Sequence, residues 1–501
     1  MFKIFTGYHL VDSYHEWKRE HRKSKNPLPL KAVKIGVAIA VTLLLWFLPA
    51  SAYGLDGLNE IEQRVIAIFA FAALMWLFDA VQAWTTSLMV VVLLLFTVSD
   101  SSLWFMREGV EKSSLVSYKS ILHCFADPII MLFIGGFILA IAATKSGLDV
   151  KLAKVMLKPF GTKSETVLLG FILVTAVFSM FISNTATAAM MLTFLTPVLK
   201  ALPADGKGKI GLALAIPIGA NIGGIGTPIG TPPNAIALKY LNNPDGMNLG
   251  IGFGQWMMVM VPLTLVLLFI SWWVLKTLFP FKQKTIHLEI QDNHVSDWRS
   301  KAVYITFGVT ILLWLTDKFT GVNANVVAML PVGVLSILGV IKKRDLEELS
   351  WSVLWMVAGG FALGVALQES GLASRLISSI PFGSWSPMLV IVGSGLLCWL
   401  MANFISHTAT AALFVPILAI VGQSIAPQLA DMGGVSTLLI GVAVGSSLAM
   451  LLPISTPPNA LADATGMIKQ KDMVITGLIM GIVGLILGYS LLILCGSKGL
   501  I

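Results

Sequence analysis

The sequence predicts an all-α polytopic membrane protein, and three observations support this fold class. Of the 501 residues, 56% are hydrophobic and only 12% are charged, whereas a soluble domain carries about 25% charged residues. Apolar runs that approach the roughly 20 residues needed to cross a bilayer recur along the chain, for example at 35–48 and 261–275. The same polar motifs occur once in each half of the chain. We therefore expect about eleven transmembrane helices plus two re-entrant hairpins, arranged in two repeats within a lipid bilayer.

The eleven predicted transmembrane helices follow one another along the apolar stretches of the chain. They lie near 32–50, 62–78, 83–98, 129–144, 210–240, 254–279, 302–318, 323–342, 352–368, 435–462 and 472–496. Two further apolar stretches, 165–200 and 385–422, are each interrupted in the middle by a short polar segment. Irregular polar backbone survives in a membrane only where protein or a water-filled cavity surrounds it. Each stretch is therefore predicted to be a re-entrant hairpin.

The distribution of Lys and Arg predicts the orientation of these helices. Eight cationic residues precede or open the first span: Lys3, Lys18, Arg19, Arg22, Lys23, Lys25, Lys31 and Lys34. Such a cluster beside a span is typical of a cytoplasmic flank, so the net charge of +8 is assigned to membrane topology and we expect no nucleic-acid partner. The predicted external connections 51–61, 241–250 and 369–384 contain one cation, Arg375, although the external loop 99–128 contains three. We expect a protein of the cell's inner (plasma) membrane, with a cytoplasmic N-terminus and an external C-terminus.

Four motifs recur between the two halves with offsets of 223 to 225 residues. The pairs are Gly135-Gly136-Phe137 with Gly359-Gly360-Phe361, Ser146-Gly147-Leu148 with Ser370-Gly371-Leu372, Ser183-Asn184-Thr185 with Ser406-His407-Thr408, and Thr231-Pro232-Pro233-Asn234 with Thr456-Pro457-Pro458-Asn459. After the second motif, the first copy is followed by Lys151, Lys154, Lys158 and Lys163, and the second copy by Arg375 alone. The two copies are therefore expected to face opposite sides of the membrane. This is an inverted-topology repeat, a recurring plan of secondary transporters.

The Ser-Asn-Thr motif is predicted to form the tip of the first hairpin. One half-helix should end near Ile182, and a second should begin near Thr185. Ser, Thr and Asn are good N-cap residues, and they place polar groups beside free N–H donors at the positive end of a helix dipole, which favours an anion. Carbonyl groups released at the end of the first half-helix can coordinate a hard cation such as sodium. One copy could merely cap a kink, but two copies in equivalent repeats favour a binding site.

The Thr-Pro-Pro-Asn motif is predicted to break a transmembrane helix in each half. Proline lacks an N–H and clashes with the preceding turn, so Pro232-Pro233 and Pro457-Pro458 should interrupt their helices. A break at mid-membrane exposes backbone polar groups beside Thr231 and Thr456. A simple kink is the alternative interpretation, and the duplication weakens it.

The sequence lacks the motifs that are typical of enzymes and of metal sites. Three cysteines are scattered without CxxC spacing, six of seven histidines fall in polar segments, and there is no P-loop, Gly-Xaa-Ser-Xaa-Gly elbow or cluster of intramembrane acids. We therefore expect a protein that is not an enzyme.

Together, these motifs resemble the divalent anion:sodium symporters, the INDY-type dicarboxylate transporters, from about residue 32 to the C-terminus. The resemblance implies a homodimer in which a scaffold holds an elevator-like transport domain. On this basis 1–31 is a cytoplasmic basic segment, 32–163 and 254–384 are scaffold parts, and 164–253 and 385–501 are transport parts. The segment after Gly147 alternates Lys with apolar residues, so we expect it to lie along the membrane interface.

The resemblance also implies residue roles. Substrate carboxylates would contact Ser183, Asn184 and Thr185 in one half and Ser406, His407 and Thr408 in the other, with Thr231, Thr456 and Pro457 nearby. The first sodium site would use Ser179, Ser183, Asn184 and Gly230, and the second would use Ala402, His407 and Ser455. The sequence departs from the sodium-coupled pattern at Ala402, which lacks the expected hydroxyl, and at His407, which stands where Asn is usual. A charged His407 could supply the positive charge of the second sodium, or a neutral His407 could donate a hydrogen bond as Asn would.

The sequence thus predicts a secondary active transporter of C4 dicarboxylates such as succinate, malate or fumarate, coupled to Na+. The alternative within the family is a sodium-independent dicarboxylate or citrate exchanger. A sulfate transporter and an anion channel are further alternatives, because hydroxyl groups and helix ends suit several anions.

Overall fold

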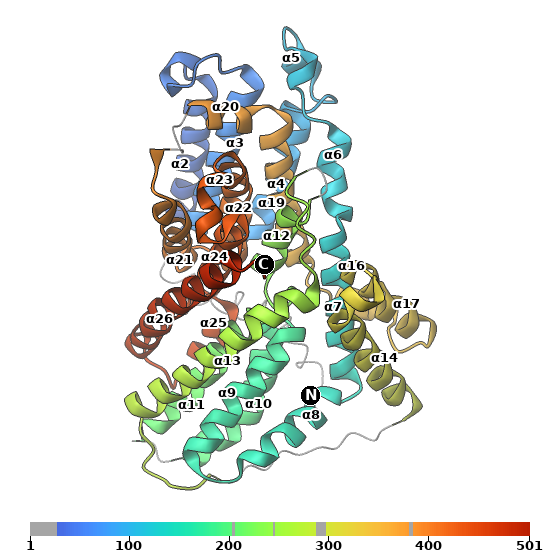
Figure 1. The fold of residues 1–501 in the computed structure, drawn as a ribbon, viewed down its shortest axis with the longest axis vertical. Coiled ribbons are helices and arrows are strands. Elements are labelled where there is room, and N and C mark those ends of the chain that lie inside the picture. Colours follow the sequence, from blue (N-terminus) through green and yellow to red (C-terminus); the bar gives the residue numbers. More distant parts are fainter. Residues whose placement is uncertain (1–27, 203–205, 244–245, 287–296, 380–383, 501) are drawn as a thin grey trace.

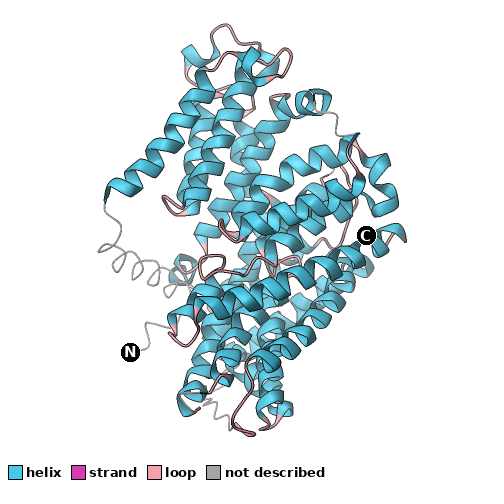
Figure 2. Cartoon of the chain, turned by 90° about the vertical axis from the view of Figure 1, so that its left-hand side faces the viewer, coloured by secondary structure: helices cyan, strands magenta, loops and turns pink. Residues whose placement is uncertain are grey.

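The structure is a computed structural model that describes residues 28–202, 206–243, 246–286, 297–379 and 384–500 (Figure 1). All the regular elements in these ranges are helices (Figure 2). Eight of the helices are long and apolar enough to cross a membrane, or nine if one bent pair is counted as a single span. Three shorter apolar helical segments lie at 83–97, 324–337 and 389–402. The prediction of an all-helical protein with many membrane spans is confirmed, while the number of eleven spans stays a prediction.

The helices coincide with the predicted stretches. The eight long spans lie on α2 (Leu28–Phe47), α3 (Glu60–Phe78), α7 (Pro128–Lys145), α9 (Ser164–Phe181), α13 (Phe253–Leu278), α19 (Trp351–Glu369), α22 (His407–Ser424) and α26 (Gln470–Ser497). A further helix, α14 (Trp298–Leu315), coincides with the predicted stretch 302–318. The shorter ones are α4 (Ala83–Thr97), α16 (Ala324–Val327), α17 (Met329–Ile337) and α21 (Ser394–Ala402). Most of the predicted basic segment 1–31 lies outside the described residues.

The two hairpins and the two broken helices have the predicted form. The first hairpin joins α9 to α10 (Asn184–Ala201), and the second joins α21 to α22. The first broken helix consists of α11 (Gly208–Gly224) and α12 (Pro232–Leu241), and the second of α24 (Gly434–Ser447) and α25 (Pro457–Ala464). The prolines occupy the first positions of α12 and α25, where a missing N–H costs nothing because the helix has no acceptor for it.

The two broken helices exchange their second halves between the repeats. α12, from the first repeat, packs against α22 and α24 of the second, and α25, from the second repeat, packs against α10 and α11 of the first. Figure 1 shows α12 beside α22 and α25 beside α11. Each hairpin is therefore covered by a half-helix from the opposite half of the chain.

The repeated Gly-Gly-Phe motif allows close helix packing. A Cβ atom on Gly135 of α7 would lie 2.2 Å from the carbonyl oxygen of Ala328, and a Cβ on Gly359 of α19 would lie 2.5 Å from Cβ of Ser87 on α4. Small residues let helix backbones approach within a membrane. This packing explains why the motif recurs without any polar side chain.

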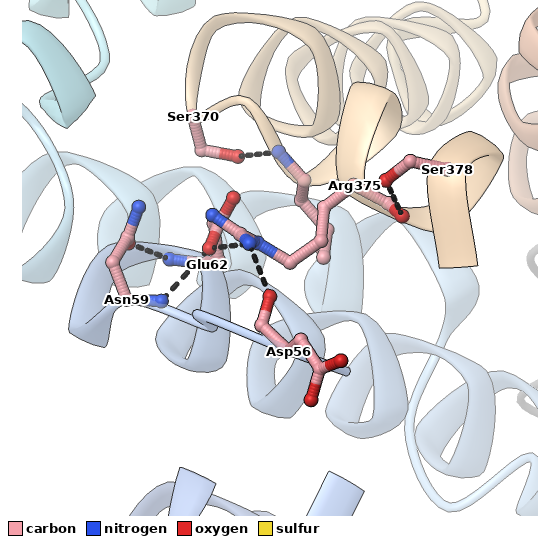
Figure 3. A network of polar contacts seen from close by, with 7 residues as sticks. Asp56, Asn59, Glu62, Ser370, Arg375 and Ser378 are labelled. Carbon is pink, nitrogen blue, oxygen red and sulfur yellow. Dashed lines mark hydrogen bonds and ion pairs between the residues drawn. The ribbon is translucent and has the colours of Figure 1, made fainter. Parts of the chain in front are cut away.

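Two short amphipathic helices follow the repeated Ser-Gly-Leu motif, α8 (Leu148–Leu157) and α20 (Leu372–Ser379). α8 buries Leu148, Ala153 and Leu157 while its lysines stay exposed. α20 is tied to α3 through Arg375, whose Nε donates to Glu62 Oε2 at 2.7 Å and whose guanidinium also donates to the carbonyl oxygen of Asp56 (Figure 3).

Candidate functional site

The candidate site is formed by the two hairpin tips and the two helix breaks. In each hairpin the chain leaves one helix, makes a short turn and starts a second helix at a serine N-cap. Ser183 Oγ accepts from the N–H of Ala186 at 3.3 Å, and Ser406 Oγ accepts from the N–H of Ala409 at 3.1 Å. The first four N–H groups of a helix have no partner inside it, and the serine accepts from one of them in each hairpin. The starts of α10 and α22 therefore still offer backbone donors to an anion. The expected half-helix boundaries are thus confirmed to within two residues.

At the first hairpin tip, two oxygen atoms lie close to the hydroxyl oxygen of Ser179. Ser179 Oγ lies 2.6 Å from Asn184 Oδ1 and 2.7 Å from the carbonyl oxygen of Ala220. A serine hydroxyl has a single proton, so it can be donated to only one of these two acceptors. Side-chain and carbonyl oxygens are the ligands that hard cations prefer. This cluster therefore offers oxygen ligands to a cation.

Gly224 and Gly230 leave room beside this oxygen cluster. A Cβ on Gly224 would lie 2.7 Å from Asn184 Oδ1 and 3.1 Å from the carbonyl oxygen of Gly230. The backbone of the first helix break therefore approaches the Asn184 side chain closely only because glycine is present. The structure brings together Ser179, Asn184 and Gly230, which the resemblance assigned to the first sodium site, and Ser183 is the N-cap next to them.

The second hairpin tip has a different donor set. His407 Nε2 lies 2.6 Å from the carbonyl oxygen of Ala449. A carbonyl oxygen only accepts hydrogen bonds, so Nε2 must carry a proton and donate here. The position of the proton on the imidazole ring is thus assigned from the hydrogen-bond partner of Nε2. The imidazole thus presents a donor at the position where the amide Asn184 presents an oxygen to Ser179.

The remaining residues of the second set are also engaged differently. Ala402 is fully buried and has no hydroxyl. Ser455 Oγ donates to the carbonyl oxygen of Asn403 at 3.0 Å and accepts from the N–H of Leu452 at 3.1 Å. These groups close the hairpin end on the second helix break. Ser455 Oγ also lies 3.4 Å from Asn403 Oδ1, so the oxygens of the second half gather on Ser455 and Asn403, and Ala402 and His407 add none to them.

The two helix breaks are held by matching hydrogen bonds. Asn234 Nδ2 donates to the carbonyl oxygens of Gly224 at 3.0 Å and Thr227 at 2.8 Å. Asn459 Nδ2 donates to the carbonyl oxygens of Met450 at 2.9 Å and Leu452 at 3.1 Å. Thr227 and Leu452 differ by the repeat offset of 225 residues, so the internal symmetry extends to individual bonds. Unwound carbonyl groups need such partners inside a membrane.

Asn221 connects the two halves and was missed by the sequence reasoning. Its Nδ2 donates to Thr456 Oγ1 at 3.2 Å and to Asn459 Oδ1 at 3.0 Å. Among the sequence-predicted residues, Thr456 is thereby joined to the first broken helix, whereas Thr231 makes no side-chain cap bond at the start of α12. An amide within an apolar span is uncommon and marks a functional candidate. That signal was available in the sequence around Asn221.

Two indole groups support the helix breaks and were also missed. Trp256 Nε1 donates to the carbonyl oxygen of Ile225 at 3.1 Å, and Trp399 Nε1 donates to the carbonyl oxygen of Leu448 at 3.2 Å. Both acceptors lie where a broken helix ends. Neither tryptophan belongs to a repeated motif, so the pattern of repeats did not reveal them.

The chain is similar to known membrane transporters. The family model of the sodium:sulfate symporter transmembrane region matches residues 30–497. The chain is 29% identical over 498 residues to the sodium-dependent dicarboxylate transporter SdcS of Staphylococcus saprophyticus, covering 92% of this chain and 90% of that protein. It is 31% identical over 482 residues to an uncharacterized transporter of Haemophilus influenzae, covering 91% and 95%.

A solved structure has a similar fold. The YdaH transporter of Alcanivorax borkumensis matches with a TM-score of 0.53 at 12% sequence identity, over 76% of this chain and 88% of that one. This likeness concerns the fold alone. Because the family model covers nearly the whole chain and a full-length relative is 31% identical, the chain belongs to the sodium:sulfate symporter family and is a membrane transporter rather than an enzyme.

Proposed function

We propose that this protein is a secondary active transporter of C4 dicarboxylates, such as succinate, malate and fumarate, coupled to sodium. The observation that carries the proposal is the pair of serine-capped hairpin tips, each beside a helix break. The N-termini of α10 and α22 each have free N–H groups that can bind a carboxylate, so together they suit a substrate with one carboxylate at each end. The relative SdcS is named as a sodium-dependent dicarboxylate transporter, which agrees with this substrate class.

The oxygen cluster at Ser179 supports sodium as the coupling ion. It combines a hydroxyl, an amide oxygen and a carbonyl oxygen without a carboxylate, a set suited to a monovalent cation. We infer one sodium site from Ser179, Ser183, Asn184 and Gly230. The corresponding set in the second half, with Ala402, His407 and Ser455, differs from the first, because Ala402 has no hydroxyl and His407 presents an N–H group where Asn184 presents an oxygen.

A sodium-independent dicarboxylate or citrate exchanger is the second candidate. His407 favours it, because a fixed N–H donor at Ala449 can stabilise an anionic site without a second cation. The two candidates differ in whether the first oxygen cluster must be filled before substrate binds.

For the transport cycle we propose an elevator mechanism in a homodimer. The exchange of α12 and α25 between the repeats joins both hairpins and both broken helices into one packed unit. Such a unit can move as a body, carrying the site past a scaffold built from residues 32–163 and 254–384. The moving unit consists of residues 164–253 and 385–501. As it moves, the substrate site that it holds faces first one side of the membrane and then the other.

Counterflow of labelled succinate into proteoliposomes, with and without sodium, tests the proposal. Sodium-stimulated uptake against unlabelled internal succinate supports the symporter, and equal exchange in sodium-free buffer supports the exchanger. Net flux without counterflow overturns both in favour of a channel. Ser183→Ala, Asn184→Ala and Thr408→Ala should each lower apparent affinity by about ten- to hundredfold, the effect of one lost hydrogen bond to a charged group. Normal transport by all three variants would contradict the site assignment.

A further inference from the structure

Asn221 holds the start of α25 in a defined hydrogen-bonded state. Its Nδ2 donates to Thr456 Oγ1 and to Asn459 Oδ1, and all three side chains are buried. The orientation of the Asn459 amide is settled by its own Nδ2, which donates to two carbonyl oxygens. Asn459 Oδ1 is therefore an acceptor, so Asn221 must present its NH2 group to it. The direction of each bond follows from the chemistry of the partners.

The hydroxyl oxygen of Thr456 has both its acceptor positions occupied. It accepts from Asn221 Nδ2 at 3.2 Å and from the backbone N–H of Asn459 at 3.2 Å. A threonine hydroxyl accepts two hydrogen bonds and donates one. Its proton is therefore left for a third group, and Thr456 can act toward that group only as a donor.

No other donor is free in the first turn of α25. Pro457 and Pro458 have no N–H, and the N–H of Asn459, the third residue of the helix, is already donated to Thr456. The helix dipole still makes this end favourable for negative charge. The Thr456 hydroxyl is thus the side-chain group through which the start of α25 donates a hydrogen bond.

The equivalent position in the other repeat lacks this arrangement. Thr231 precedes the same pair of prolines, but it makes no side-chain cap bond. Ser446 stands at the repeat offset of 225 from Asn221, and its buried hydroxyl has no hydrogen-bond partner. The serine side chain is shorter than that of asparagine and has no NH2 group, so α24 does not fix Thr231 as α11 fixes Thr456.

On the basis of the proposed function, we infer that Asn221 is a positioning residue that makes Thr456 a dedicated donor to a substrate carboxylate. A carboxylate offers only acceptors, whereas a protonated carboxyl group brings an O–H that needs an acceptor. Thr456 has no acceptor position left. The fixed hydroxyl therefore favours the fully ionised acid over the monoprotonated one, and Asn221 sets this preference without touching the substrate.

The test uses Asn221→Ser, which copies the residue of the other repeat, in the full-length protein in proteoliposomes. We expect KM for succinate to rise about tenfold, the effect of one hydrogen bond to a charged group, with maximal rate and sodium dependence retained. At acid pH, one carboxyl group of succinate is protonated, and the ratio of succinate uptake by the variant to uptake by the wild type should increase. The same ratio for fumarate, which stays ionised at that pH, should not change. Ser446→Ala, which removes an unpartnered hydroxyl, is the matched control and should change neither quantity.

A double-mutant cycle shows whether Asn221 acts through Thr456. Thr456→Val should reproduce the effects of Asn221→Ser, whereas Thr456→Ser, which keeps the hydroxyl, should behave like the wild type. The variant that combines Asn221→Ser with Thr456→Val should show little more effect than either single change. If Asn221→Ser is not monodisperse, the pH preference of Thr456→Val against Thr456→Ser carries the test. An unchanged KM and pH preference in Asn221→Ser, or additive effects in the cycle, overturn the inference. Failure of the wild type to take up any dicarboxylate overturns the proposed function instead.

Discussion

The ammonium group of Lys239 lies 2.8 Å from the carboxylate of Asp127, and this ion pair joins the first broken helix to the start of α7. Lys239 Nζ also lies 3.4 Å from the centroid of the Phe361 ring on α19. Both partners are mostly buried. α12 belongs to the unit that we propose moves, while α7 and α19 belong to the proposed scaffold. Ala464 occupies the position related to Lys239 by the repeat offset, so the second repeat cannot form the same contact in the opposite state.

The first prediction is that this ion pair favours one end state of the carrier. Asp127→Asn or Lys239→Met should shift the ratio of the two states about fivefold, as expected for about 1 kcal/mol. The ratio can be measured without substrate, by labelling a cysteine placed at Thr185 with impermeant reagent from either side of sealed vesicles. Glu60→Gln, which removes the exposed partner of an ion pair within α3, is the control. An unchanged labelling ratio in both variants would refute the role of the pair.

The second prediction concerns the oxygen cluster. Ser179→Ala removes the hydroxyl shared by Asn184 and Ala220, so the sodium concentration for half-maximal uptake should rise about tenfold or more. Thr175→Ala is the matched control, because its buried hydroxyl lies one turn earlier and bonds only within α9, to the carbonyl oxygen of Phe171. Equal sodium dependence in the two variants would remove Ser179 from the cation site.

The third prediction concerns the second half-site. Ala402→Thr combined with His407→Asn restores a hydroxyl and an amide at the positions that are occupied by Ser179 and Asn184 in the first half. This double variant should gain a steeper dependence of uptake on sodium, because it recreates the oxygen ligands of the first cluster. The Hill coefficient for sodium, measured with fumarate, gives the comparison. If the wild type and the double variant have the same coefficient, His407 has no part in coupling.

The fourth prediction concerns stability. The Glu62 carboxylate is almost completely buried and is paired with Arg375 and with the backbone N–H of Asn59 (Figure 3). Arg375→Ala leaves this carboxylate without its cation, a change that costs about 3 kcal/mol in buried pairs. The midpoint of thermal unfolding in detergent should therefore fall by several degrees. Arg107→Ala, which removes an exposed bond to the carbonyl oxygen of Asp100, should have little effect. Equal midpoints for the two variants would contradict the prediction.

The repeated motifs predicted the hairpins and helix breaks well because their cause is local. Pro232-Pro233 cannot continue a helix wherever it is placed, and Ser183 caps a helix by a bond to a residue three positions later. Such effects depend on the order of residues alone. They are therefore visible in the sequence before any packing is known.

The contacts between the halves could not be predicted in the same way. The bond from Asn221 to Thr456 joins residues 235 positions apart, and nothing in the local sequence of either indicates the other. The pair of Lys239 and Asp127 was hidden for the same reason. Both depend on the exchange of α12 and α25, which results from packing of whole helices rather than from a motif.

The exchange of half-helices also has a consequence for biosynthesis. α12 finds its partner helix α22 only after about 170 further residues have been made. At about 5–20 residues per second, a ribosome needs roughly 10–35 s for that length. During this interval α12, with its lysine and tyrosine near the end of the helix, must wait in the membrane or the insertion machinery without the surface that later covers it. The nascent first half thus carries a half-helix whose partner surface does not yet exist, and the surface of this half-helix needs protection until the second half is made.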